Sequence, residues 1–191
     1  MAWTTITNGQ TGLEVSNKLN AEFATLESNI ASLQTDKADR PVIVLQSSDL
    51  TNQVPTVLNT ALKVKFGATV NNTYVFLDTD GTVTFKQAGH YHVEVRLQVG
   101  RTGSAGTALL LARCVKNGVQ YGGGSAFKLA DSEVLFPCVA NLHLDIEVDD
   151  TFYFQIIRDA SGDNSGGLYM TDPSDGWSDI PSANITITKI G

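Results

Sequence analysis

The sequence predicts a mainly β protein, a sandwich of antiparallel strands preceded by one short helix. Two segments, His90–Val99 and Leu142–Val148, alternate between apolar and polar residues, which is typical of strands with one buried face. The dipeptides Asp80-Gly81 and Asn117-Gly118 stand between apolar runs and are strong hairpin signals. Ahead of them, residues 11–38 follow a helical period instead.

Composition excludes several classes of partner. The chain has 191 residues, of which 42% are hydrophobic, and a net charge of -7. Such a charge repels phosphate backbones and anionic lipid, so we expect neither nucleic acid nor a membrane as partner. Residues Met1–Thr4 lack the basic and apolar regions of a signal peptide. We therefore expect a soluble protein without membrane insertion.

Residues 1–10 are expected to form a separate N-terminal segment, and residues 11–40 a helical stalk. Thr11 and Glu14 have the spacing of a capping box, and Pro41 stops the helix. Apolar residues recur at alternating steps of four and three, as in the seam of a coiled coil; they are Leu19, Phe23, Leu26, Ile30 and Leu33.

This apolar seam predicts self-association of the helix, because the sequence predicts no second helix on which it can pack. Docking on the β-domain of the same chain is the alternative. The seam is short, and in a parallel pair it places Glu22 opposite Glu27, which is mildly repulsive. We therefore expect the β-domain, not the helix, to determine the number of copies.

Residues 41–191 are expected to form one β-domain. The expected strands are Val42–Leu45, Leu62–Phe66, Tyr74–Leu77, Thr82–Phe85, His90–Val99, Thr107–Val115, Val134–Cys138, Leu142–Val148, Phe152–Ile157 and Asn184–Ile190. Many short strands separated by turn signals favour a sandwich, and a jelly roll in particular.

No catalytic motif is found, so we expect no enzyme and no cofactor. The segment Gly122–Ser125 is interpreted as a glycine-rich turn, because no phosphate-loop Lys follows it. His90 and His92 point to one side of a strand and are weak candidates for a metal site; a polar outer face is the simpler interpretation. Cys114 and Cys138 lie in apolar runs, which favours buried thiols, with a disulfide as the alternative.

The segment Asp159–Ser182 is the candidate binding region, because long loops in compact domains are commonly functional. Aromatic rings beside carboxylates suit sugar or protein recognition. The candidate residues are Asp163, Asn164, Tyr169, Asp172, Asp175 and Trp177. In the alternative interpretation, Tyr169 and Trp177 fill the end of the sandwich.

Residues 42–190 resemble the jelly roll of the complement-component-1q globular head and the tumour necrosis factor superfamily. Gly89–Val95 matches the core Gly-x-Tyr strand of that family, with Val93 and Val95 in place of aromatic residues. Further matches, in order along the chain, are Phe66, Asn72, Leu77, Val115–Gly118 and Leu142–Phe154, the last with Asp149-Asp150 in place of Gly-Asp. Val83 stands where that family usually has Phe, and its distance from Leu77 is shorter by one residue. The resemblance implies a homotrimer of sandwiches.

The N-terminal part, from Trp3 to Phe23, is similar to the start of bacteriophage tail-fibre and appendage proteins, and Asn184–Gly191 to their ends. That resemblance implies a virion protein with a short attachment segment before a coiled coil. Trp3, Ile6, Leu13 and Val15 are the residues expected to attach to another virion protein.

These resemblances lead to one expected function and two alternatives. The expected function is a tail-fibre or tail-tip appendage, located in the virion, whose jelly roll binds a glycan or protein of the host surface. The first alternative is a capsid decoration or head-fibre protein. The second is a trimeric, lectin-like carbohydrate-binding protein unrelated to virions.

Overall fold

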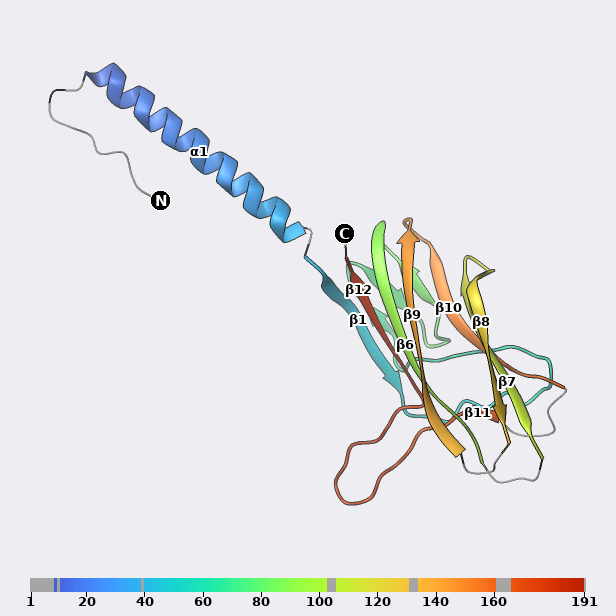
Figure 1. The fold of residues 1–191 in the computed structure, drawn as a ribbon. Helices are drawn as coiled ribbons and strands as arrows, with labels where there is room; N and C mark the ends of the chain where they lie inside the picture. The colour runs from blue at the N-terminus through green and yellow to red at the C-terminus, as the bar shows by residue number, and fades with distance from the viewer. Residues whose placement is uncertain are drawn as a thin grey trace. The chain divides into compact units, whose positions relative to one another are not determined.

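A computed structural model of the chain describes residues 9, 11–38, 40–102, 106–130, 134–160 and 166–190 (Figure 1). The chain divides into two units, one containing the helix and the other spanning Pro41–Ile190. The expected attachment residues Trp3 and Ile6 and the expected binding residues Asp163 and Asn164 lie outside the described residues.

The single described helix, α1, spans Gly12–Ala38 and begins with the predicted capping box. The backbone amide of Thr11 donates to Glu14 Oε2 at 2.8 Å, and the amide of Glu14 donates to Thr11 Oγ1 at 3.4 Å. The backbone amide and the hydroxyl of Thr11 both donate to the carboxylate of Glu14 and stabilise its charged form, so the pKa of Glu14 lies below its usual value. No helix in the described part of the chain is long and apolar enough to cross a membrane.

The larger unit consists of two antiparallel sheets. Sheet A has the order β1 (Val42–Asp49), β12 (Ala183–Lys189), β6 (Gly89–Arg101) and β9 (Val134–Ile146). The short strand β11 (Gly166–Leu168) pairs with the same edge of β6 as β12, at the C-terminal end of β6. Sheet B has the order β3 (Val70–Asn71), β4 (Val75–Leu77), β5 (Val83–Phe85), β10 (Thr151–Arg158), β7 (Ala108–Lys116) and β8 (Val119–Leu129), with β2 (Leu62–Lys63) also on β10.

The predicted hairpin turns are both present. Asn117 and Gly118 join β7 to β8 with φ values of 50° and 78°, as a tight hairpin turn requires. Gly81, between β4 and β5, has a φ of 88°. A Cβ at Gly81 would lie 1.9 Å from the carbonyl oxygen of Val64, so only glycine fits there.

Several predicted strand limits were wrong. The two segments Val134–Cys138 and Leu142–Val148 form one continuous strand, β9. The segment Gly122–Ser125, expected to be a turn, lies within β8, which the sequence analysis missed together with β3 and β11. Glycine and small residues give β8 no alternating apolar pattern, because most of its side chains are exposed.

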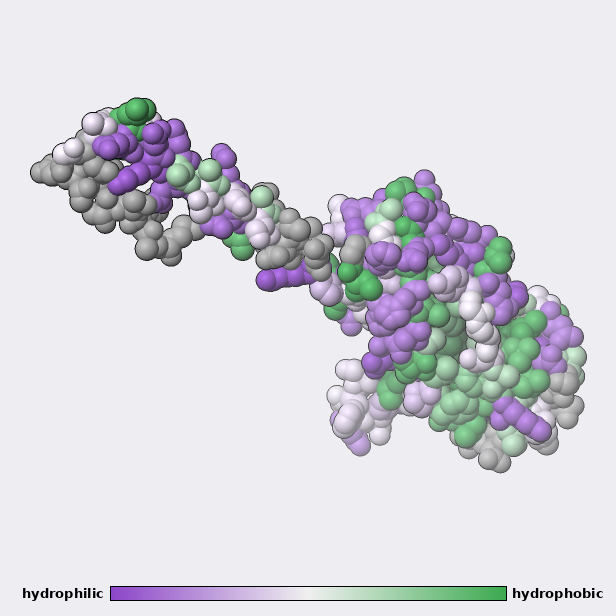
Figure 2. Space-filling view, turned by 45° about the horizontal axis from the view of Figure 1, so that its top comes forward, coloured by the Kyte–Doolittle hydropathy of each residue, from purple (hydrophilic) through white to green (hydrophobic). Residues whose placement is uncertain are grey.

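Among the described residues, β8 and β9 each have a strand neighbour on one edge only, β7 and β6 respectively. Hydrophobic residues gather on the face of the larger unit shown in Figure 2. Along β8 and β9 a set of inward-facing side chains packs against the core yet stays partly exposed; these are Tyr121, Phe127, Val134, Phe136, Cys138, Ala140 and Leu142. The core is therefore incompletely covered along this side.

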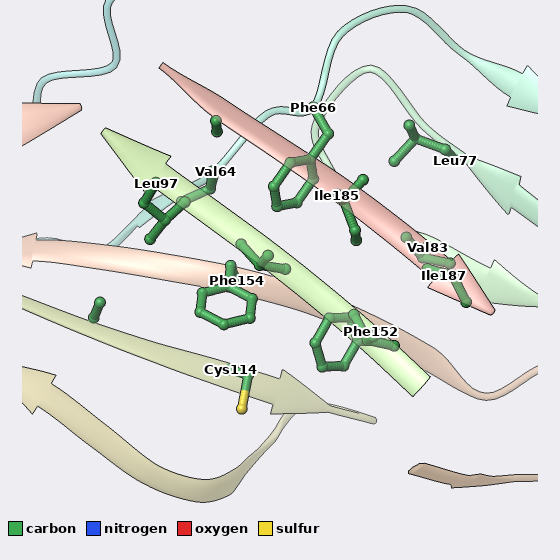
Figure 3. Packing of buried hydrophobic residues seen from close by; sticks show 14 of the residues in the cluster. Val64, Phe66, Leu77, Val83, Leu97, Cys114, Phe152, Phe154, Ile185 and Ile187 are labelled. Carbon is green, nitrogen blue, oxygen red and sulfur yellow. The ribbon is translucent and has the colours of Figure 1, made fainter. Parts of the chain in front are cut away.

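The two sheets share one hydrophobic core, an arrangement compatible with a β-sandwich (Figure 3). The alternating prediction for β6 is confirmed, because Tyr91, Val93, Val95, Leu97 and Val99 are all buried. Phe152, Phe154 and Ile156 on β10 of sheet B are buried in the same cluster. Both cysteines are free thiols; Cys114 is buried and Cys138 half-buried, and burial raises the pKa of each.

Candidate functional site

The candidate site is the loop Tyr169–Ser182, which joins β11 to β12 and projects from the end of the sandwich (Figure 1). Thr171 and Ile180 exchange two backbone hydrogen bonds, of 3.0 and 2.8 Å, and so close residues 172–179 into a tip. At this tip Asp175 and Gly176 have φ values of 68° and 80°. Two consecutive residues with positive φ form the tight turn that reverses the chain.

Hydrogen bonds from β6 hold the first half of the loop base. The side-chain amide of Gln98 donates to the carbonyl oxygen of Tyr169 at 2.7 Å and to Thr171 Oγ1 at 2.8 Å. The backbone amide of Tyr169 donates to the carbonyl oxygen of Gln98 at 3.0 Å, and that of Met170 to Asn52 Oδ1 at 2.9 Å. The loop therefore begins from a fixed position.

The second half of the base is fixed by two buried polar residues, Gln53 and Ser182. The amide nitrogen of Gln53 donates to Ser182 Oγ at 3.2 Å and to the carbonyl oxygen of Lys65 at 3.0 Å. The backbone amide of Ser182 donates to the carbonyl oxygen of Asp49 at 3.0 Å. Because buried polar groups are costly when unpaired, this network holds the end of the loop in place.

The tip itself is exposed. Trp177 is 80% exposed, so it does not fill the end of the sandwich. Asp172 and Asp175 are exposed as well, and so is Asp179, which the sequence analysis did not single out. Residues 170–182 contain no Lys or Arg. An exposed indole beside carboxylates suits a ligand with an apolar face and hydrogen-bond donors, such as a neutral sugar.

Of the two interpretations of Tyr169, an exposed ring for stacking or a ring buried at the end of the sandwich, the structure supports the second, because the residue is only 6% exposed. It follows β11 directly, and its backbone pairs with Gln98 in β6, which turns the ring inward. Of the two aromatic candidates, only Trp177 can contact a ligand from the surface described here.

The two histidines of β6 lie on the polar face of the strand, opposite the buried residues Tyr91 and Val93. His90 Nδ1 bonds with Asp145 on β9, so it is engaged across the ladder rather than with His92. Among the residues that the structure describes, no group of three or more His, Cys, Asp or Glu side chains is arranged to hold a metal ion.

The remaining expected contact residues lie on α1. Leu13 is 71% exposed and Val15 half-buried in the first turns of the helix. The five seam residues from Leu19 to Leu33 are between 40% and 66% exposed, so the seam is not covered within the helical unit itself.

A half-open trough of about 490 Å³ lies on the face of sheet B turned away from the core. Its floor includes Leu111 and Ile157, and its polar lining includes Arg113, whose guanidinium donates two hydrogen bonds, of 3.1 and 3.0 Å, to Gln155 Oε1. Opposite Arg113 the pairing of β7 with β8 slips, and residues 122–124 form a bulge of three glycines. Those glycines contribute no side chains, which keeps the trough open.

No protein-family model matches the chain, and no curated protein sequence matches it.

Proposed function

We propose that this chain is a homotrimeric, non-enzymatic virion protein of a bacteriophage, of the tail-fibre or tail-tip type. Its N-terminal segment attaches to another virion protein, and its β-domain binds the host surface. The proposal combines the sequence resemblance with three features of the structure.

The first feature is the strand order, which supports a jelly roll like that of the complement-component-1q and tumour necrosis factor proteins. The chain passes repeatedly between the sheets, and the first and last strands, β1 and β12, pair side by side in sheet A. Long-range pairing of this kind is what a Greek-key sandwich requires.

The second feature supports trimer formation. The partly exposed apolar side chains along β8 and β9 need a cover, and so does the exposed seam of α1. Every copy of the chain carries the apolar side chains along β8 and β9 and the apolar seam of α1. Self-association with closed symmetry therefore covers these two surfaces in each copy. The net charge of three copies, 3 × -7 = -21, keeps such an assembly soluble.

The third feature, which carries the binding role, is the exposed Trp177 on a loop with a fixed base. The β-domain begins at the opposite end: Val42 pairs with Lys189 at one end of β12, whereas Ala183, next to the loop, pairs with Asp49 at the other. Seven residues of β12 separate the two ends by roughly 20 Å. A domain attached through its N-terminus therefore presents the loop on its far side.

Two measurements test this proposal. Light scattering coupled to size exclusion should give three times the chain mass of 20.5 kDa, and a monomer at all concentrations would contradict it. Fluorescently labelled protein should bind cells of the host bacterium, and Trp177→Ala should abolish that binding while leaving the trimer mass unchanged. Immunogold labelling of intact particles then separates a tail location from a capsid location.

A further inference from the structure

All three histidines of the chain lie on the exposed face of two neighbouring strands of sheet A. His90 and His92 belong to β6, and His143 belongs to β9. The ladder places His92 directly opposite His143, and His90 directly opposite Asp145. The relevant histidine pair therefore runs across the ladder, not along β6.

The two pairs differ in how their nitrogen atoms are engaged. His90 is bonded to Asp145. The rings of His92 and His143 lie with centroids 5.1 Å apart and planes inclined by 37°. Within the described part of the chain, neither of these two rings makes a hydrogen bond, so their nitrogen lone pairs are available to a ligand.

We propose that His92 and His143 bind one divalent transition-metal ion between their imidazole rings. A metal ion bound to two imidazole nitrogens, each at about 2.0–2.1 Å, holds those nitrogens roughly 3–4 Å apart. Two rings whose centroids are 5.1 Å apart reach this separation through small side-chain rotations. Imidazole is a good ligand for Zn²⁺, Ni²⁺ and Cu²⁺, whereas Mg²⁺ and Ca²⁺ prefer oxygen.

The surroundings of this pair favour a cation. The outward-facing neighbours are His90 and Glu94 on β6, Asn141 and Asp145 on β9, and Thr188 on β12. None of these neighbours is Lys or Arg. The nearest guanidinium on this face of β6, that of Arg96, donates to Glu94 Oε1 at 2.6 Å and is neutralised by it.

The protein supplies two ligands, because no third His, Cys, Asp or Glu joins them among the described residues. Water molecules complete the coordination of an exposed ion. The site is therefore open and reversible, with a weaker affinity than a closed structural zinc site of four protein ligands.

Calorimetric titration of the intact protein with ZnCl₂ tests the proposal. We expect one Zn²⁺ per chain and a loss of affinity of about 100-fold or more in His143→Asn, since even the loss of an outer-shell partner costs about 10–100-fold. The matched variant His90→Asn should change the affinity by less than about threefold, because its ring is bound to Asp145.

Circular dichroism must show that each variant is folded, and His92→Asn gives an independent test of the same pair. Three results would overturn the proposal. They are the absence of Zn²⁺ uptake by the unchanged protein, unaltered uptake by folded His143→Asn, and a loss of uptake in His90→Asn as large as in His143→Asn. The last result would mean that the ion is bound along β6.

Discussion

The two ends of the β-domain use carboxylates in opposite ways. At the end where the domain begins, Asp150 accepts hydrogen bonds from Asn117 Nδ2 at 2.6 Å and from the amide of Glu147 at 2.9 Å, and pairs with Lys116 Nζ at 2.9 Å. At the far end, the carboxylates beside Trp177 are exposed to solvent. Asp150 is used to join strands, whereas the far carboxylates stay available to a ligand.

Because their partners differ, the two ends should respond differently to the same kind of substitution. Polar groups that are paired and buried contribute to folding, and their loss leaves partners unsatisfied. Exposed groups on a loop tip contribute little to folding and can serve binding instead. Substitutions at the two ends test this difference, and their expected effects on the free energy of unfolding fall from the first to the last.

Asp150→Ala should have the largest effect. Its carboxylate is 12% exposed, and its removal breaks the ion pair with Lys116 and leaves Asn117 Nδ2 and the amide of Glu147 without their acceptor. We expect the free energy of unfolding to fall by about 2–4 kcal/mol, measured by urea denaturation. Asp172→Ala, at the loop tip, is the matched control and should change it by less than about 0.5 kcal/mol. Equal effects at the two positions would remove the contrast between the ends.

The carboxylate of Asp150 should also make the free energy of unfolding depend on pH in the acidic range. Burial alone raises the pKa of Asp150, but the hydrogen bonds from Asn117, Glu147 and Lys116 outweigh it and lower the pKa from 3.8 to about 2. The unfolded chain then takes up the proton first, so this contribution is complete above about pH 4 and is lost as the pH falls through about 2.

The lost contribution should be about 2 kcal/mol, measured as the free energy of unfolding between pH 4 and pH 2. Asp150→Asn should flatten that part of the pH profile. If the slope is the same in the variant, other carboxylates are responsible for it.

Gln53→Ala should have an intermediate effect. The side-chain amide of Gln53 is buried, and its nitrogen donates hydrogen bonds to the carbonyl oxygen of Lys65 and to Ser182 Oγ. Its oxygen accepts a hydrogen bond of 2.7 Å from the backbone amide of Lys65. We expect a loss of about 1–3 kcal/mol in the free energy of unfolding. Hydrogen exchange should also become faster at Ser182, whose amide protection reports the loop base. Unchanged exchange there would show that Gln53 does not hold the loop.

Trp177→Ala should have the smallest effect on stability, less than about 0.5 kcal/mol, because the side chain is 80% exposed. Trp3 is the only other tryptophan, so in Trp3→Phe the fluorescence reports Trp177 alone. We expect efficient quenching of that fluorescence by acrylamide. If the loop binds as proposed, added host-surface glycan should reduce the quenching. A protected, blue-shifted emission without ligand would contradict an exposed tip.

The sequence predicted those parts of the molecule that local chemistry determines. The capping box of Thr11 and Glu14, the buried face of β6 and the turn at Asn117-Gly118 each depend on a few neighbouring residues. Strand β8 was not predicted, because an exposed edge strand that contains Gly122–Gly124 has no buried face and therefore no alternation of apolar and polar residues.

The candidate site was predicted only in part, for a similar reason. The exposure of Trp177 and the burial of Tyr169 depend on how Gln98 and Asn52 hold the loop, and these residues are far away in sequence. The pairing of His92 with His143 depends on the register of β9 against β6. Register between distant strands is a tertiary property, which one sequence does not reveal by periodicity alone.

The edges of β8 and β9 that have no strand neighbour among the described residues bear on how readily the protein aggregates at high concentration. An exposed strand edge can pair with a strand of another chain, and repeated pairing of this kind produces fibrils. Both edges carry features that oppose this growth: Pro137, which has no amide hydrogen, lies in β9, and the glycine bulge interrupts β8. These two features lower the tendency of the chain to polymerise at high concentration.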